Sequence, residues 1–145
     1  MIIRFSQKLA DKIKEPGLSP APMAENPFLD WHAHLFIHQR AQYILVTNSQ
    51  SLFSVFFFGK GVSDFNWFYK RMSETLGEVL HDMGADLIYQ RAIIPNTGQI
   101  HLAKSQDKKV ISSMNELVFA AKDWLDDGDV SPYDLAFKVN EMVLS

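Results

Sequence analysis

Histidines stand close together in one short segment of the sequence, at His32, His34 and His38. If this segment is a β-strand, His32 and His34 point to the same side of it, about 6–7 Å apart. Two imidazoles at that spacing can chelate Zn²⁺, Fe²⁺ or Mn²⁺ when a neighbouring strand supplies a carboxylate or a third histidine such as His101. Because Phe36 interrupts the row and no complete set of ligands follows, His32 and His34 are only weak metal candidates, and we expect no cofactor. The other interpretation of the segment is a half-exposed polar strand face, covered by the neighbouring proline-rich stretch.

Motifs for nucleophilic catalysis and for phosphate binding find little support. The chain has no Cys, which excludes thiolate nucleophiles, disulfides and thiolate metal sites. No Gly-x-Ser-x-Gly elbow occurs, and Gly59-Lys60-Gly61 is too short for a P-loop and is typical of a turn that needs a positive φ. Asp126 and Asp127 fall at an expected helix end, where carboxylates are solvated rather than placed for acid–base catalysis. No catalytic residue is therefore predicted.

Polar and aromatic residues near the ends of the expected elements form a second group. They are Trp31, His32, Arg40, Tyr43, Asn48, Arg91, Asn115 and Lys122. Arg91 lies in an expected strand, where a charged side chain needs a partner or a ligand, and Asn115 lies in an expected first helical turn, whose N–H groups favour an anion. A cleft bordered by Arg91, Trp31, Tyr43 and this helix start would bind a small anionic ligand. The alternative is that Arg91 pairs with an acid such as Glu116 and that Asn115 only assists the helix cap.

Composition and charge restrict the class of protein. The chain has 145 residues, of which 47% are hydrophobic and 21% charged, and this suits one globular domain spanning residues 1–145. The net charge of −3 at pH 7 argues against a protein that binds nucleic acid, because that task needs a basic face. No apolar stretch approaches the roughly 20 residues of a membrane span, and the first residues do not have the pattern of a secretory signal. We therefore expect a soluble cytoplasmic protein with no membrane partner and no nucleic acid partner.

Alternating and continuous apolar runs predict the strands. The expected ranges are Ile2–Phe5, His32–His38, Tyr43–Asn48, Leu52–Phe58, Leu87–Ile94 and Gln99–Ser105. Short connections make the second, third and fourth strands an antiparallel meander, and Leu52–Phe58, which is apolar on both faces, is expected at the centre of the sheet. Pro95-Asn96-Thr97-Gly98 predicts a hairpin turn between the last two strands.

Capping signals predict where the helices begin. The signals are Ser6 for a helix through about Lys14, Ser63 for a helix through Met83, the capping box Ser113-Met114-Asn115-Glu116, and Ser131-Pro132 for the last helix. A proline-rich surface linker at about 16–27 follows the first helix. The fold class is therefore α+β, with a mainly antiparallel sheet of five to six strands and three to four helices packed on it.

Four segments, taken in order, resemble a family of small bacterial proteins that is known only as a domain of unknown function. They are Ile2–Leu9, Asn26–Phe36 with Trp-His-Ala-x-Leu-Phe, Gln42–Asn48 with Gln-Tyr-Ile-Leu-x-Thr-Asn, and Ser113–Lys122 with Ser-Met-Asn-Glu-Leu-Val. The resemblance runs from the first residues to about Leu125 and implies a single intact domain, but it implies no activity, substrate or cofactor. Relatives often have Asn where this chain has His34, which implies that the family does not depend on a metal at that position.

Two classes of function follow from these observations. The favoured class is a binding or interaction module for a small anionic ligand or a protein partner. The alternative is a metal-dependent or hydrolase-like enzyme built on the histidine-rich strand at 32–38. The module is favoured because no complete catalytic set is visible, and the fold class alone does not decide between the two.

Overall fold

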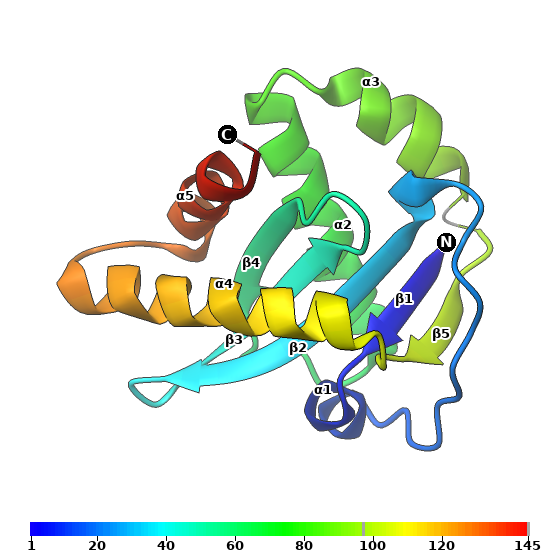
Figure 1. Ribbon diagram of the computed structural model, residues 1–145, viewed down its shortest axis with the longest axis horizontal. Helices are drawn as coiled ribbons and strands as arrows, with labels where there is room; N and C mark the ends of the chain where they lie inside the picture. Colours follow the sequence, from blue (N-terminus) through cyan, green and yellow to red (C-terminus); the bar gives the residue numbers. More distant parts are fainter. Residues whose placement is uncertain (97, 145) are drawn as a thin grey trace.

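A five-stranded sheet lies at the centre of the computed structural model, which describes residues 1–96 and 98–144 (Figure 1). Its strands are β1 (Ile2–Phe5), β2 (Asp30–His38), β3 (Ala41–Asn48), β4 (Ser54–Phe58) and β5 (His101–Lys104), in the spatial order β4-β3-β2-β1-β5. The expected antiparallel meander is confirmed for β2, β3 and β4, but β1 runs parallel to both β2 and β5. The sheet is thus mixed rather than mainly antiparallel, because long stretches of chain separate β1 from β2 and from β5 and permit a parallel pairing that short turns exclude.

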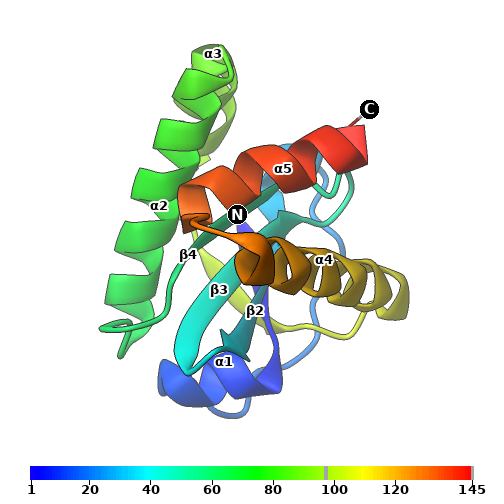
Figure 2. The ribbon, with the colours of Figure 1, turned by 90° about the vertical axis from the view of Figure 1, so that its left-hand side faces the viewer.

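Helices cover both faces of this sheet. They are α1 (Gln7–Lys12), α2 (Phe65–Asp82), α3 (Asp86–Ile88), α4 (Lys108–Asp127) and α5 (Pro132–Leu144), with single helical turns at η1 (Pro27–Leu29), η2 (Tyr89–Ile93) and η3 (Ile94–Asn96). Figure 2 shows α2 on one side of the sheet and α4 on the other, while α5 runs along the edge strand β4. The α+β class is confirmed, and the described residues form five α-helices rather than three to four because the short α3 was not foreseen. Within residues 1–96 and 98–144, no helix has the length and apolar character that crossing a membrane requires.

Aromatic side chains join α2 to the sheet. The ring of Phe68 lies 5.0 Å from that of Phe5 in β1 and 5.9 Å from that of Phe57 in β4, measured between ring centroids. Phe68, Met72 and Leu76 are fully buried at a spacing of four residues, so one stripe of α2 faces the core. Burial of each of these side chains stabilises the fold by about 1.5–3 kcal/mol.

The second predicted hairpin is wrong. Residues of the expected strand Leu87–Ile94 are helical instead, in α3, η2 and the start of η3, and only His101–Lys104 of the expected Gln99–Ser105 pairs as a strand. Tyr89 explains the difference: its hydroxyl donates to the carbonyl oxygen of Ser73 at 3.1 Å, and its ring lies against Gly77, so the segment packs on α2. Packing on α2 therefore overrides the β-preference of the apolar residues. Thr97 of the predicted turn lies outside the described residues.

Two predicted helix starts are corrected and two are confirmed. Asp64, not Ser63, caps α2 by accepting from the N–H of Trp67 at 2.9 Å. Asp107 caps α4, so the predicted capping box at Ser113 lies inside a helix that begins five residues earlier. A carboxylate accepts these N–H groups as well as a hydroxyl does, and the earlier start buries Val110. The start signals at Ser6 and Ser131 are confirmed.

The edge strand β4 is closed by a side chain. This strand was predicted at the centre of the sheet, but it lies at one edge. The Asn140 amide on α5 takes the place of a further strand: its Nδ2 donates to the carbonyl oxygen of Ser54, and its Oδ1 accepts from the N–H of Ser54, both at 2.8 Å. The apolar character of both faces of β4 therefore reflects cover by helices and not a central position.

Candidate functional site

Four cations gather at the end of the sheet where β2 turns into β3. The groove they surround has a volume of about 1020 Å³ and is called the basic groove here; its lining residues are Lys12, Arg40, Ala41, Gln42, Phe58, Lys60, Gly61 and Arg71. They come from the end of α1, the β2–β3 turn with the start of β3, the end of β4, the following loop and the first half of α2, and these parts lie in the lower half of Figure 2. No residue of this lining is acidic. The potential in the groove is therefore positive although the whole chain has a net charge of −3.

Local backbone geometry holds two of these arginines in place. Gln39 and Arg40 both have a positive φ, of 50° and 68°, so the turn is tight and its tip projects Arg40 from the sheet. Gly61 has a φ of 84°, and a Cβ atom there would lie 3.1 Å from Nη2 of Arg71. Arg71 itself donates through Nη1 to the carbonyl oxygen of Phe58 at 3.0 Å. The turn at Gly59–Gly61 thus leaves room for Arg71 beside β4, in agreement with the predicted need for a positive φ.

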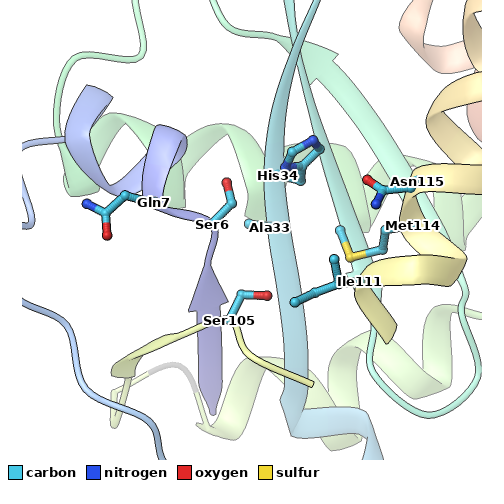
Figure 3. A pocket seen from close by; sticks show the side chains of 8 residues that line it. All are labelled: Ser6, Gln7, Ala33, His34, Ser105, Ile111, Met114 and Asn115. Atoms are coloured by element: carbon cyan, nitrogen blue, oxygen red, sulfur yellow. The ribbon is translucent and has the colours of Figure 1, made fainter. Parts of the chain in front are cut away.

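A second hollow lies beneath α4, beside the middle of β2. It has a volume of about 230 Å³, and Figure 3 shows His34 on β2 between Ser6 at the end of β1 and Asn115 on α4. Burial lowers the pKa of His34, and the charges of Lys8 and Lys122 lower it further. His34 is therefore neutral at pH 7, and the lining combines hydroxyl and amide groups with the apolar side chains of Ile111 and Met114, so the hollow is mixed in character and has no charge of its own.

A third hollow, about 240 Å³ in volume, lies at the start of β2 and is called the His32 cleft here. Its lining residues are Arg4, Ala21, Met23, Asp30, His32, Ser49, Gln106 and Asp107. Nε and Nη2 of Arg4 donate to the two carboxylate oxygens of Asp30, each at 2.9 Å, and both side chains are buried. The hydroxyl of Ser49 donates to Oδ1 of Asp30 at 2.6 Å and lies 2.7 Å from Nδ1 of His32. These four side chains form one connected hydrogen-bond network.

Burial and hydrogen bonds set the charges in the His32 cleft. Burial alone would raise the pKa of Asp30, but hydrogen bonds from Arg4, Ser49 and the N–H of Ala24 lower it to about 2. The pKa of His32 falls to about 4, first because the ring is buried and then because Arg4 is near. At pH 7 the cleft therefore contains an ion pair and a neutral imidazole.

The structure separates the residues that the sequence grouped together. Trp31 and Tyr43 are both buried, and they lie on opposite faces of the sheet, because Tyr43 pairs across the strands with Phe36 and side chains alternate along β2. Arg91 is exposed on η2, and Asn115 lies about two turns into α4. The predicted cleft between these residues is therefore wrong, because it depended on the second hairpin and on a helix start at Ser113.

The other predicted ligand-binding candidates lie away from the predicted cleft, and two of them bind to the backbone or side chains of neighbouring residues. Trp31 donates through Nε1 to the carbonyl oxygen of Phe28 at 2.8 Å. Asn48 is buried and organises the turn after β3, where its Oδ1 accepts from the N–H and the hydroxyl of Ser51, each at 3.0 Å. Arg40 lines the basic groove, and Lys122 acts on His34. These placements make Trp31 and Asn48 part of the framework and leave Arg40 facing a groove.

The histidines are not assembled into a metal site. Nε2 of His38 lies 2.7 Å from Oδ1 of Asp126, and His101 is exposed on β5. Among residues 1–96 and 98–144, no group of three or more histidine and carboxylate side chains is placed to hold a metal ion. His32 is buried, with 1% of its surface exposed, so the interpretation of a half-exposed polar strand face is wrong at that residue. Arg4 also binds the carbonyl oxygens of Ala21 and Pro22, which places the proline-rich segment beside this part of β2.

Reasoning from the sequence missed Arg4, Asp30 and Ser49. Two signals were available: Arg4 interrupts the apolar run Ile2–Phe5, and Asp30 precedes His32 by two residues, which places both side chains on the same strand face. A charge inside a strand next to a short acidic–histidine pattern indicates a buried pair. Ser49, by contrast, reaches Asp30 only because β3 pairs with β2.

Comparison with known proteins gives a family and no activity. No curated protein and no solved structure matches the chain. One family model, described as "Domain of unknown function (DUF6933)", matches residues 2–145. This match agrees with the resemblance seen in the four sequence segments. The chain therefore belongs to the DUF6933 family of domains of unknown function.

Proposed function

We propose that the chain is a binding module for a small anionic ligand and that the basic groove is its binding site. The observation that supports this best is the meeting of Lys12, Arg40, Lys60 and Arg71 around a groove with no acidic lining residue. Among residues 1–96 and 98–144, Lys12, Arg40 and Lys60 have no carboxylate within ion-pair distance. Cations that are brought together from several elements and lack acidic partners repel one another, and an anion relieves that repulsion.

The composition of the groove narrows the class of ligand. Two arginines can each grip a phosphate or a carboxylate through two N–H groups. Phe58, whose side chain is 48% exposed, and Ala41 both line the groove, so part of the lining is apolar. A phosphate or carboxylate attached to a flat apolar group satisfies both features. This kind of ligand is favoured over an enzyme substrate because the lining contains no histidine, carboxylate, hydroxyl or thiol side chain for acid–base or nucleophilic catalysis.

Titration with phenyl phosphate tests this proposal. Isothermal calorimetry in low salt should give saturable binding of phenyl phosphate, weaker binding of inorganic phosphate, and no binding of phenol. The variant Arg40→Gln should weaken the affinity for phenyl phosphate about tenfold, as expected when one charged hydrogen-bond donor is lost. Raising the salt concentration should also weaken binding, because these charges are exposed to solvent.

Arg91→Gln is the matched control. It makes the same change at an exposed arginine outside the groove, so the affinity for phenyl phosphate should stay within about twofold of that of the unmodified chain. Equal losses of affinity in Arg40→Gln and Arg91→Gln would mean that anions bind only through the overall surface charge. That result, or no binding at all, would rule out the basic groove as the site.

A further inference from the structure

The hydrogen-bond network of the His32 cleft determines where the proton of the imidazole lies. The Asp30 carboxylate is ionised and can only accept, so the short contact of 2.6 Å to Ser49 requires the Ser49 hydroxyl to donate to it. The hydroxyl has a single hydrogen, so Ser49 must accept in its other contact, at 2.7 Å from Nδ1 of His32. Neutral His32 therefore carries its proton on Nδ1, and Nε2 carries a lone pair.

Nε2 of His32 has no hydrogen-bond partner among the described residues. Among the side chains of residues 1–95 and 98–143, it is the one buried nitrogen or oxygen atom in this condition, and the ring to which it belongs lines the cleft. A buried acceptor without a donor costs stability, and such atoms are rare in folded proteins. The atom that breaks this rule thus belongs to a side chain that faces a hollow large enough for a small molecule.

Apart from the side-chain amide of Gln106, the other polar groups that line the cleft are acceptors or are already engaged. Arg4 uses its N–H groups for Asp30 and for the carbonyl oxygens of Ala21 and Pro22. Asp107 accepts the N–H groups of Lys109 and Val110 through Oδ1, at 3.0 and 3.3 Å, which also neutralises the positive end of α4. Two carboxylates, Asp30 and Asp107, and one guanidinium, Arg4, act on His32. The cleft is thus net negative, and its one uncommitted donor group, the amide of Gln106, does not reach the lone pair on Nε2 of His32.

We propose that the His32 cleft is a second binding site, for a small molecule that presents a primary ammonium group. One N–H of the ammonium donates to Nε2 of His32, and the positive charge is stabilised by the carboxylate of Asp107. This site is separate from the basic groove, because the two lie at opposite ends of β2. The His32 cleft selects a cationic donor, whereas the basic groove selects an anion.

Nitrogen NMR of the His32 ring tests the proposal directly. At pH 7 the free protein should show a protonated Nδ1 and an unprotonated Nε2. Ethylammonium chloride should shift the Nε2 signal in a saturable way, while tetramethylammonium chloride, which has the same charge and no N–H, should leave it in place. A protonated Nε2 in the free protein, or an equal response to the two salts, would overturn the proposal.

Two matched variants separate the part that the Asp107 charge plays in ligand binding from its role as the cap of α4. Asp107→Asn removes the charge and keeps a good cap, and it should weaken the binding of ethylammonium about threefold or more. Asp64→Asn makes the same change at the cap of α2 and should leave this affinity unchanged. A loss of ethylammonium binding in both variants, or in neither, would contradict the assignment. Asp107→Asn should also bind phenyl phosphate with unchanged affinity, so failure at one site is distinguishable from failure at the other.

Discussion

The two ends of β2 handle charge in opposite ways. In the His32 cleft, the guanidinium of Arg4 is buried, and the chain itself supplies its partners, Asp30 and two carbonyl oxygens. In the basic groove, Arg40 is exposed at a turn and has no acidic partner among the described residues. Burial explains the difference, because a buried charge must be paired within the fold, whereas water can solvate an exposed one. An exposed charge is therefore available to a ligand in a way that a buried one is not.

Neighbouring histidines on β2 repeat this contrast on a smaller scale. Burial lowers the pKa of both His32 and His34, but the charges around them differ. His34 is influenced by Lys8 and Lys122, whereas two carboxylates and one arginine act on His32. Two residues along one strand are thus enough to replace surroundings of lysines by surroundings of mixed charge.

Replacing one arginine at each end of β2 should give the largest difference in the free energy of unfolding. Arg4→Met leaves Asp30 as a buried carboxylate without its cation, and it should lower the free energy of unfolding by about 3–5 kcal/mol. Arg40→Met removes an exposed and unpaired charge, so it should change the free energy of unfolding by less than about 0.5 kcal/mol. Urea denaturation of both variants at pH 7 measures the two effects. Similar losses in the two variants would break the comparison between the ends of β2.

The pH dependence of stability should give the next largest effect. Folding lowers the pKa of His32 from 6.5 to about 4, so the folded state binds fewer protons than the unfolded state between these values. His32 therefore makes its full contribution to the free energy of unfolding above pH 6.5. This contribution is lost as the pH falls toward 4, by about 3 kcal/mol in all. The contribution of Asp30 to the free energy of unfolding is lost at lower pH, between pH 3.8 and about 2.

The variant His32→Gln isolates this contribution. Urea denaturation between pH 7 and pH 4 should show a steeper fall in the free energy of unfolding for the unmodified chain than for His32→Gln. His34 contributes in the same direction in both proteins, so the difference between them belongs to His32. Parallel curves for the two proteins would mean that His32 is not buried as a neutral ring.

Much of the sheet could be predicted from the sequence because its signals are local. The alternation in 32–38 and the short turns that follow give β2, β3 and β4 their order and direction. The start of α4 could not be predicted in this way, because Ser113 has the residues of a capping box and only tertiary packing shows that Asp107 is the cap. The prediction of a strand at 87–94 failed for the same reason. Tyr89 packs on Ser73 and Gly77 of α2, and these contacts lie outside the local pattern of turn residues that suggested a hairpin.

The candidate sites were harder to predict than the fold. Arg40 was predicted as a ligand-binding candidate and lines the basic groove, but Lys12, Lys60 and Arg71 come from other parts of the chain, and only the tertiary structure brings them to one groove. Each of these last three is an ordinary surface cation when the sequence is read alone. Sequence spacing detects sites that are built on one element, whereas a groove between several elements depends on how these elements pack.

A spectrum of the arginine Nε–H groups tests the contrast between the two ends of β2 most directly. Phenyl phosphate should shift the Arg40 signal until it saturates, because Arg40 is free to bind an anion, and the signal should be identified by its loss in Arg40→Gln. The Arg4 signal should stay in place throughout, because its Nε is held by Asp30 at 2.9 Å. A shift of the Arg4 signal, or a fixed Arg40 signal at saturating phenyl phosphate, would contradict the account.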